Sequence, residues 1–195
     1  MKIIELFEEP KDKYFDRLMK TLNIQRLGKG AFGHVFQHPT HKNVVVKILN
    51  TVLDPRFTRY VLWCQKHQNN PWVPKIHGIE YVDMPDVQGY DEQQQMFVFT
   101  EKLSMATQED VGNAIKLLTR SVPKEDRTSG IMDAIRLKDF RKLKQADWKV
   151  IASYATGDEK TIATRLSQIV DKHLDIHLKN VMMRNSQLVF TDPTS

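Results

Sequence analysis

The stretch "HLDIHLKNVMMRNSQLVFTDPTS", His173 to Ser195, decides which fold we expect for this chain. Asn180 follows Asp175 by five residues, and Asp192 follows Asn180 by twelve. The run between Asn180 and Asp192 has the pattern of two short strands joined by a turn, which would return Asp192 to the neighbourhood of Asn180. In a phosphoryl-transfer site a carboxylate orients the attacking hydroxyl, and hard oxygen ligands hold the metal on the triphosphate. The spacing therefore predicts a base, Asp175, and two metal ligands around one triphosphate.

A glycine cluster near the other end of the sequence points to the same chemistry. "LGKGAFGHV" places Gly28, Gly30 and Gly33 in the pattern G-x-G-x-x-G-x-V between strand-like flanks. Glycines let backbone N–H groups approach phosphate oxygens where a Cβ would clash. Lys47 ends the run "VVVK", from which a point charge would reach the α- and β-phosphates.

Each of these features also has an ordinary structural explanation. Asp and Asn frequently cap turns in surface hairpins, glycines form turns, and a lysine on an edge strand improves solubility. The order and separation of all the motifs in one chain favour the phosphoryl-transfer interpretation.

Composition places the chain among ordinary globular proteins, because 41% of its 195 residues are hydrophobic and 27% are charged. Cys64 is the only cysteine, so the chain forms no internal disulfide.

The net charge of +5 comes from scattered residues except in "RLKDFRKLK", Arg136 to Lys144, which is spaced for a solvated helix face. We therefore do not expect direct nucleic-acid binding. With no leader pattern and no apolar run long enough for a membrane, we expect a cytoplasmic location without membrane association.

The periodicity of apolar residues predicts an α+β fold in two lobes. A strand-rich lobe, residues 1–100, would contain an N-terminal helix, the glycine-rich hairpin, a small antiparallel sheet and one further helix. A reduced helical lobe, residues 101–195, would carry the catalytic and metal-binding loops. The expected helices are 11–22, 54–68, 109–119, 137–154 and 160–172, and the expected strands are 24–37 around the glycines, 42–49, 75–82, 95–100 and 187–190.

These motifs resemble those of protein kinases. "HLDIHLKN" is similar to the catalytic loop H-R-D-L-x-x-x-N, "TDP" stands where D-F-G would be, and "LGKGAFGHV" with "VVVK" is similar to the Gly-rich loop and its lysine. The resemblance covers residues 24–195. The combination of D-x-H-x-x-N-x-M with a final "TDPxS", and of a glycine loop with "HP" after it, more closely resembles the early host-shutoff serine/threonine kinases of short-tailed lytic bacteriophages.

The resemblance implies a protein-kinase-like two-lobe fold with a truncated C-lobe, and Mg-ATP-dependent phosphorylation of host bacterial proteins. It makes Asp175 the catalytic base, Asn180 and Asp192 the Mg²⁺ ligands, and His177 a contact of the γ-phosphate. Adenine would lie between Val35, Val45 and Met182, and the backbone of Glu101 to Leu103 would hydrogen-bond its edge. The full set of residues implied to hold ATP is Leu27, Gly28, Gly30, Gly33, Val35, Val45, Lys47, Glu101, Leu103 and Met182.

The sequence departs from the kinase pattern in several places. The helix at 54–68 has no glutamate to pair with Lys47, and Leu174 replaces the arginine that reads a phosphorylated activation loop. Neither an activation segment nor the usual peptide platform follows Asp192, so we expect no control by loop phosphorylation. Substrates would be held by the helices between 109 and 155 or by a partner subunit.

Two other functions remain open at this point. A histidine two residues after the catalytic aspartate also occurs in aminoglycoside and choline phosphotransferases, so His177 is compatible with a small-molecule kinase. The missing helix glutamate is compatible with a pseudokinase that binds and inhibits a host protein. Independently of these functions, His177 has an ordinary structural explanation, because a histidine in such a loop can simply hydrogen-bond the backbone.

Overall fold

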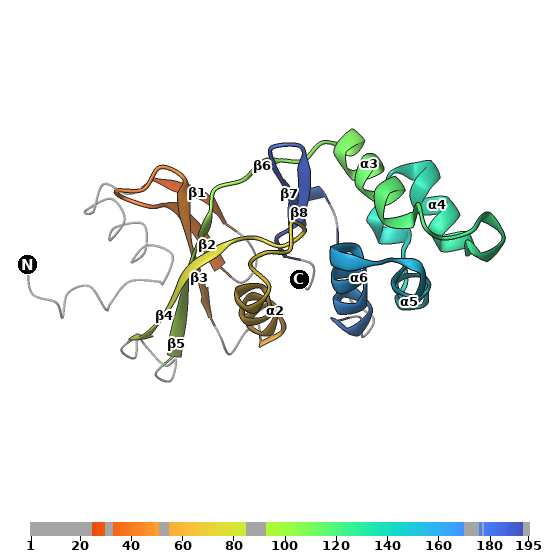
Figure 1. Cartoon of the computed structure of the whole chain (residues 1–195). Helices are drawn as coiled ribbons and strands as arrows, with labels where there is room; N and C mark the ends of the chain where they lie inside the picture. The colour runs from red at the N-terminus through yellow and green to blue at the C-terminus, as the bar shows by residue number, and fades with distance from the viewer. Residues whose placement is uncertain are drawn as a thin grey trace, which may run out of the picture. The chain divides into compact units, whose positions relative to one another are not determined.

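The computed structural model describes residues 25–29, 33–50, 55–84, 93–169, 176 and 178–192. This part of the chain has an α+β fold, as predicted, with a five-stranded antiparallel sheet, a three-stranded sheet and five α-helices (Figure 1). It divides into two compact units. The first unit takes the described residues of Met1–Val61 and Lys75–Lys102, and the second those of Leu62–Pro74 and Leu103–Ser195. The predicted helix at 11–22 lies outside the described residues.

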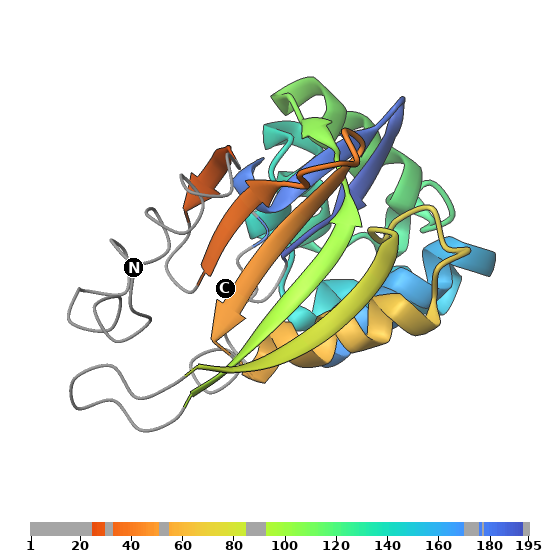
Figure 2. The ribbon, with the colours of Figure 1, turned by 90° about the vertical axis from the view of Figure 1, so that its left-hand side faces the viewer.

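The sheet of the first unit confirms the strands predicted for this part of the chain (Figure 2). Val46 and Phe36 are cross-strand partners and are buried, together with Ile48, on one face of the sheet. Val45 and Lys47 alternate with them and lie on the other face. In spatial order the antiparallel strands are β1 (Arg26–Lys29), β2 (Gly33–Gln37), β3 (Val44–Asn50), β5 (Gln93–Glu101) and β4 (Ile76–Met84).

Helix α2 (Pro55–Lys66) confirms the helix predicted at 54–68. Proline suits its first position, because an N–H there has no partner within the helix. Phe57, Tyr60, Val61 and Cys64 are almost fully buried and recur at intervals of three or four residues, which is the period of one helix face.

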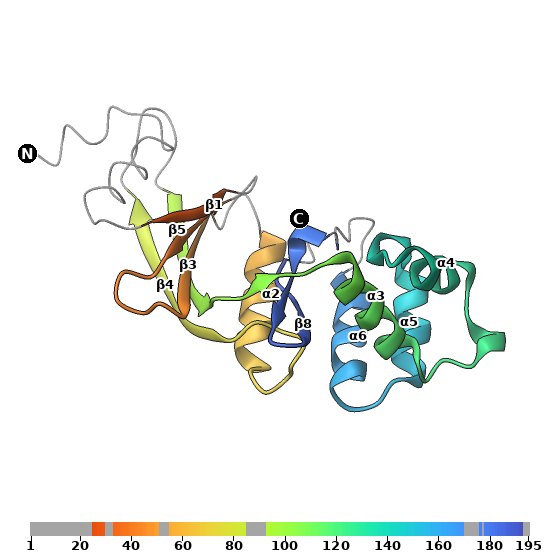
Figure 3. The same ribbon diagram turned by 90° about the horizontal axis from the view of Figure 1, so that it is seen from above.

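The second unit contains mostly helices (Figure 3). Helix α3 confirms a prediction and begins with a capping box, in which Thr107 Oγ1 accepts from the Asp110 amide and the Asp110 carboxylate accepts from the Thr107 amide. None of the described helices is long and apolar enough to cross a membrane. In chain order the elements are β6 (Ser104–Met105), α3 (Gln108–Thr119), η2 (Lys124–Asp126), α4 (Ser129–Leu137), η3 (Phe140–Lys142), α5 (Gln145–Tyr154), α6 (Gly157–Ile169), η4 (Leu178–Asn180), β7 (Val181–Arg184) and β8 (Gln187–Phe190).

The helix predicted at 137–154 is confirmed only for residues 145–154, which form α5, and is wrong for the residues before them. Helix α4 ends at Leu137 because Lys138 adopts a left-handed backbone with φ of 52°. Asp139 then starts the short turn η3 by accepting a hydrogen bond from the Arg141 amide at 3.0 Å. The basic residues from Arg136 onward therefore lie on a helix end and a turn, not along one helix face. Helix α4 itself, capped by Thr128, is not among the predicted helices.

Four aromatic rings form the centre of the core in the second unit. Phe190 lies 5.2 Å from Phe140, 6.1 Å from Trp72 and 6.3 Å from Trp148, measured between ring centroids. None of the four side chains is more than 2% exposed. The Phe190 amide also donates to the Trp72 carbonyl at 2.9 Å. The cluster therefore fixes β8 against η3, α5 and the segment that follows α2.

A buried carboxylate joins the starts of α4 and α5. Asp147 is 5% exposed and accepts hydrogen bonds from the Lys144 amide at 2.7 Å and from the Thr128 hydroxyl. Gly130 lies directly against this carboxylate, where an added Cβ would be 2.8 Å from Asp147 Cγ. A side chain at position 130 would therefore displace the carboxylate that caps α5 and holds Thr128, the cap of α4.

We expect Gly130→Ala to lower the free energy of unfolding by about 2 kcal/mol, because two capping hydrogen bonds of about 1 kcal/mol each must be distorted. Urea denaturation followed by circular dichroism measures this. Gly28→Ala is the matched control, because a Cβ there meets no atom within 4 Å. Equal stability of Gly130→Ala and the wild type would contradict the packing described here.

Candidate functional site

The hairpin of β7 and β8 brings together the two residues predicted to bind a metal. Asn180 ends η4 directly before β7, and Asp192 follows β8 by two residues. The Asn180 carbonyl accepts hydrogen bonds from the amides of Thr191 and Asp192 at 3.0 and 3.2 Å. The Thr191 hydroxyl donates to the same carbonyl at 3.0 Å. The predicted hairpin and the return of Asp192 to Asn180 are therefore confirmed.

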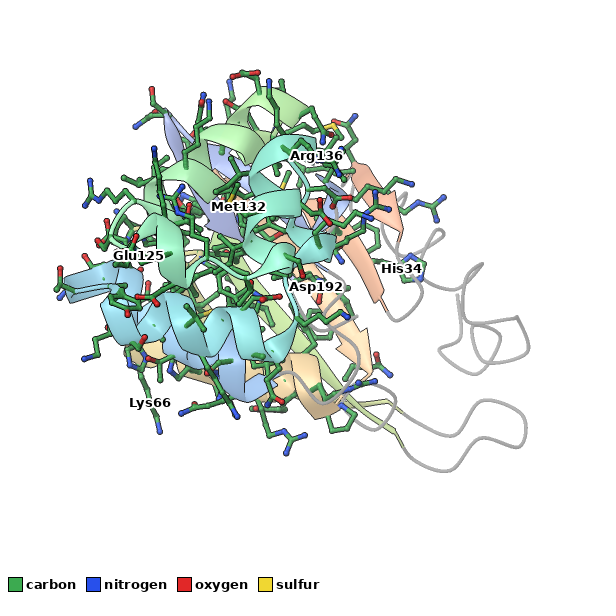
Figure 4. The ribbon with its side chains drawn as sticks, turned by 90° about the vertical axis from the view of Figure 1, so that its right-hand side faces the viewer. His34, Lys66, Glu125, Met132, Arg136 and Asp192 are labelled. Carbon is green, nitrogen blue, oxygen red and sulfur yellow. The ribbon has the colours of Figure 1, made fainter. Side chains whose placement is uncertain are left out.

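The hairpin is attached to the rest of its unit at both strands. Arg184 on β7 donates to the carbonyls of Pro71 and Val73 at 3.1 and 2.8 Å. On β8, Phe190 is held by the aromatic cluster and by its bond to Trp72. These contacts determine the position of Asp192, which Figure 4 labels.

The donor set at the base of the hairpin fits Mg²⁺ better than a softer metal. Asn180 offers an amide oxygen and Asp192 a carboxylate, and both residues are half-buried. No group of three or more His, Cys, Asp or Glu side chains that could hold a metal occurs among the described residues. Mg²⁺ does not need one, because it is usually bound through one or two carboxylates together with water and substrate phosphates.

Asp175 and His177, predicted as catalytic base and γ-phosphate contact, lie outside the described residues. Ile176 between them is 2% exposed, and the turn η4 begins two residues later. Their roles remain predictions from the sequence.

In the first unit, three of the predicted nucleotide contacts share one face of the sheet. Lys47 on β3 is the cross-strand partner of Val35 on β2. Directly paired residues point to the same face, and so do residues two apart on a strand. Val35, Val45 and Lys47 are therefore on a common face, as a nucleotide-binding strand pair requires.

Lys47 also contacts an aromatic ring that the sequence analysis did not single out. Its Nζ lies 3.7 Å from the ring centroid of Phe57, which belongs to α2 and is 3% exposed. The face of an aromatic ring attracts a cation. Helix α2, which has no glutamate to pair with Lys47, thus places the aromatic ring of Phe57 beside it. In the sequence, the position of Phe57 on the apolar face of this helix is the feature that could have indicated the contact.

The glycine hairpin forms as predicted, with Gly28 on β1 paired to Val35 and with Gly33 starting β2. Gly30 lies outside the described residues. Leu27, the predicted contact next to Gly28, is 40% exposed. A Cβ at Gly28 would meet nothing within 4 Å, and its φ is not left-handed. Neither packing nor backbone conformation therefore requires glycine at 28, which leaves close approach of a ligand as a reason for it.

The segment predicted to bind adenine is partly engaged within the first unit. The amides of Glu101 and Lys102 donate to the carbonyls of Lys75 and Asn43 at 3.1 and 2.8 Å. Because those two N–H groups already have acceptors, hydrogen bonding of adenine by an N–H group here depends on Leu103.

Met182, predicted to cover adenine, lies in the second unit. It is half-buried on β7 and pairs with Met105 on β6 and with Val189 on β8.

Comparison with known proteins adds no family assignment. No protein-family model matches the chain, and no curated protein matches it significantly. The functional interpretation therefore depends on the motifs and on the geometry described above.

We expect the Lys47–Phe57 contact to give a coupling energy of about 0.5–2 kcal/mol in a double-mutant cycle of Lys47→Met and Phe57→Leu. The reason is that both substitutions remove the same attraction between charge and ring, while leaving apolar side chains that pack. Urea denaturation of the four proteins measures the coupling. Phe57→Tyr should retain it, and strictly additive effects would rule out the contact.

Proposed function

We propose that the chain is a Mg-ATP-dependent serine/threonine protein kinase that phosphorylates host bacterial proteins, as the resembling bacteriophage kinases do. The first unit would be the nucleotide-binding lobe, and the second a reduced catalytic lobe of protein-kinase-like fold. The observation that carries the proposal is the pairing of Asn180 and Asp192 through the Asn180 carbonyl. It supports the proposal because it brings together the backbones of two residues, twelve positions apart, whose side chains carry hard oxygen atoms of the kind that bind Mg²⁺.

In the first unit, Lys47 would bind the α- and β-phosphates through its ammonium group. The contact with the Phe57 ring stabilises the positive charge of Lys47. The open space at Gly28 would allow backbone N–H groups to approach phosphate oxygens.

In the second unit, Asn180 and Asp192 would hold Mg²⁺, which supplies neutralisation of charge on the phosphates. Asp175 would orient the substrate hydroxyl and accept its proton as that oxygen bonds to the γ-phosphorus. The bond from the γ-phosphorus to the β–γ bridging oxygen breaks, and ADP leaves with both bonding electrons. His177 would steady the γ-phosphoryl group by hydrogen bonding during this transfer.

Incubation with γ-labelled ATP and Mg²⁺ in a bacterial lysate should label many proteins, and the bands should disappear with Asp175→Asn and with Asp192→Asn. Asp133→Asn is the matched control, because Asp133 only pairs with Arg136 on the surface of α4. It should label as the wild type does.

Identical labelling by the wild type and Asp175→Asn would contradict catalysis on proteins. Labelling of an added aminoglycoside or choline instead of protein would favour a small-molecule phosphotransferase.

Gly28→Ala should weaken ATP binding roughly tenfold, which is the loss of about 1.4 kcal/mol from displaced hydrogen bonds to phosphate. Its thermal stability should match the wild type, since the added methyl group meets no protein atom. Isothermal titration calorimetry measures the affinity. Unchanged affinity would remove Gly28 from the phosphate site.

A further inference from the structure

A groove of about 400 Å³ lies in the second unit, and helix α3 forms one side of it. On this side the α3 groove is lined by Asp110, Asn113, Ala114 and Leu117. These positions recur at intervals of three or four residues, so they share one face of the helix. The volume lies within the range of about 300–1,000 Å³ that is typical of ligand-binding clefts.

The other side of the α3 groove is one face of the three-stranded sheet. Met183 on β7 pairs with Ser104 on β6 and with Leu188 on β8. Directly paired residues point to the same face, so these three side chains form a row along the groove. The turn of the hairpin also lines it, beginning at Asn185, whose left-handed φ of 54° suits asparagine. The groove is therefore built on regular elements that hold its shape.

The floor of the groove is apolar, and its rim is polar and uncharged. Ala114, Met183 and Leu188 line the floor and are at most 8% exposed. Asn113 and Asn185 are exposed at the rim, and their side chains have no hydrogen-bond partner within the part of the chain that the structure describes. A carboxamide offers both donors and an acceptor, so it can bond either the N–H or the C=O of a peptide.

Asp110 is the one charged residue among the described residues that line the groove. Its Oδ2 accepts hydrogen bonds from the amide and the hydroxyl of Thr107 at 2.8 and 2.7 Å. These bonds lower the pKa of the Asp110 carboxyl, which is therefore ionised at neutral pH. No cation of the described ranges forms an ion pair with it. The groove thus has a negative charge on its α3 side.

The charged residues nearest to the lining in sequence have other positions or partners. Arg184 lies outside the lining and donates to two backbone carbonyls at 3.1 and 2.8 Å. Glu109 pairs with Lys138. Lys116 is exposed and follows Asp110 by six residues, which places it on a different face of α3.

This lining is unsuited to nucleic acid. Phosphate groups are held mainly by lysine and arginine, and neither occurs among the described residues of the lining. Trp72 lines the groove but is only 2% exposed, so its ring face is not open for stacking on a base.

The sheet edge beside the groove favours an extended occupant. Ser104 and Met105 of β6 line the groove, and β6 is an edge strand of its sheet. In an antiparallel pair, the backbone groups of successive residues point alternately toward and away from the partner strand. One of the two residues therefore directs its N–H and C=O away from β7, where an extended peptide can pair with them.

We propose that the α3 groove binds an extended docking segment of the protein substrate, with a lysine or arginine beside Asp110 and apolar side chains at alternate positions on the floor. This inference rests on the proposed function and deepens it, because the sequence lacks the usual peptide platform of kinases. The groove reaches the tip of the hairpin, whereas Asn180 and Asp192 lie at its base. The four residues of β7 span about 13 Å, so the docking segment is distinct from the residue that is phosphorylated.

Binding without ATP tests the groove separately from catalysis. The purified protein is applied to an array of decapeptides that carry one arginine and two leucines, with the leucines at alternate positions and their spacing from the arginine varied. Matched arrays replace the arginine by glutamine or both leucines by serine. Fluorescence anisotropy then measures the affinity of the best peptide. It should bind roughly two- to fivefold more tightly than its glutamine form, as one exposed ion pair allows, and at least roughly tenfold more tightly than its serine form.

Two variants of the groove separate charge from apolar contact. Asp110→Asn should remove the preference for arginine but keep that for leucine, since the amide oxygen can still accept from Thr107. Leu117→Gln should weaken binding of all the peptides roughly threefold or more. Asp133→Asn and Leu137→Gln, both on α4 and outside the lining, are the matched controls and should bind as the wild type does. Thermal unfolding identifies any variant that has lost its fold.

Equal binding of the arginine and glutamine peptides, or of the leucine and serine peptides, would overturn the proposal. So would an effect of Leu137→Gln as large as that of Leu117→Gln. A dimer that Leu117→Gln dissociates in sedimentation, without binding of any peptide, would assign the groove to a second copy of the chain instead.

The proposed function and the docking groove can fail separately. Asp175→Asn should bind the peptides as the wild type does. Labelling of proteins without peptide binding would contradict the groove alone. Peptide binding without labelling would contradict the kinase function alone and leave the groove as a peptide-binding site.

Discussion

The packing of Phe190 against Trp72, Phe140 and Trp148 is the constraint on which the candidate site in the second unit depends. Removing a fully buried phenylalanine side chain typically costs about 3–5 kcal/mol, so this cluster strongly restrains β8. Asp192 lies two residues beyond Phe190 and bonds back to Asn180. The position of the proposed metal ligands is therefore set by core packing together with the hairpin.

In the first unit, the pairing of β2, β3 and β5 determines the position of Lys47. Lys47 is held between Val35 and Val98 by strand register and has the Phe57 ring on its own face. The negative face of the ring stabilises the ammonium group. In the proposed function this group would bind the phosphates of ATP.

Much of the fold follows from local patterns in the sequence. Alternating apolar residues predict the hairpins, and the separation of Asn180 from Asp192 by two short strands predicts their meeting. The break after Leu137 could not be predicted, because it results from the left-handed backbone at Lys138 and from the capping by Asp139, against a pattern that favours a continuous helix.

The Lys47–Phe57 contact is a long-range juxtaposition, and spacing along one segment does not reveal it. The sequence motifs indicate which residues have the chemistry for phosphoryl transfer. Tertiary packing determines which side chains those residues contact.

The most direct test of the central claim is calorimetric titration of ATP, with Mg²⁺ and with a chelator, into the wild type, Lys47→Met, Asp192→Asn and the double variant. We expect tighter binding with Mg²⁺ in the wild type, loss of this Mg²⁺ effect in Asp192→Asn, and weaker binding under both conditions in Lys47→Met. ATP binding unaffected by either substitution, or the same Mg²⁺ effect in Asp192→Asn as in the wild type, would contradict it.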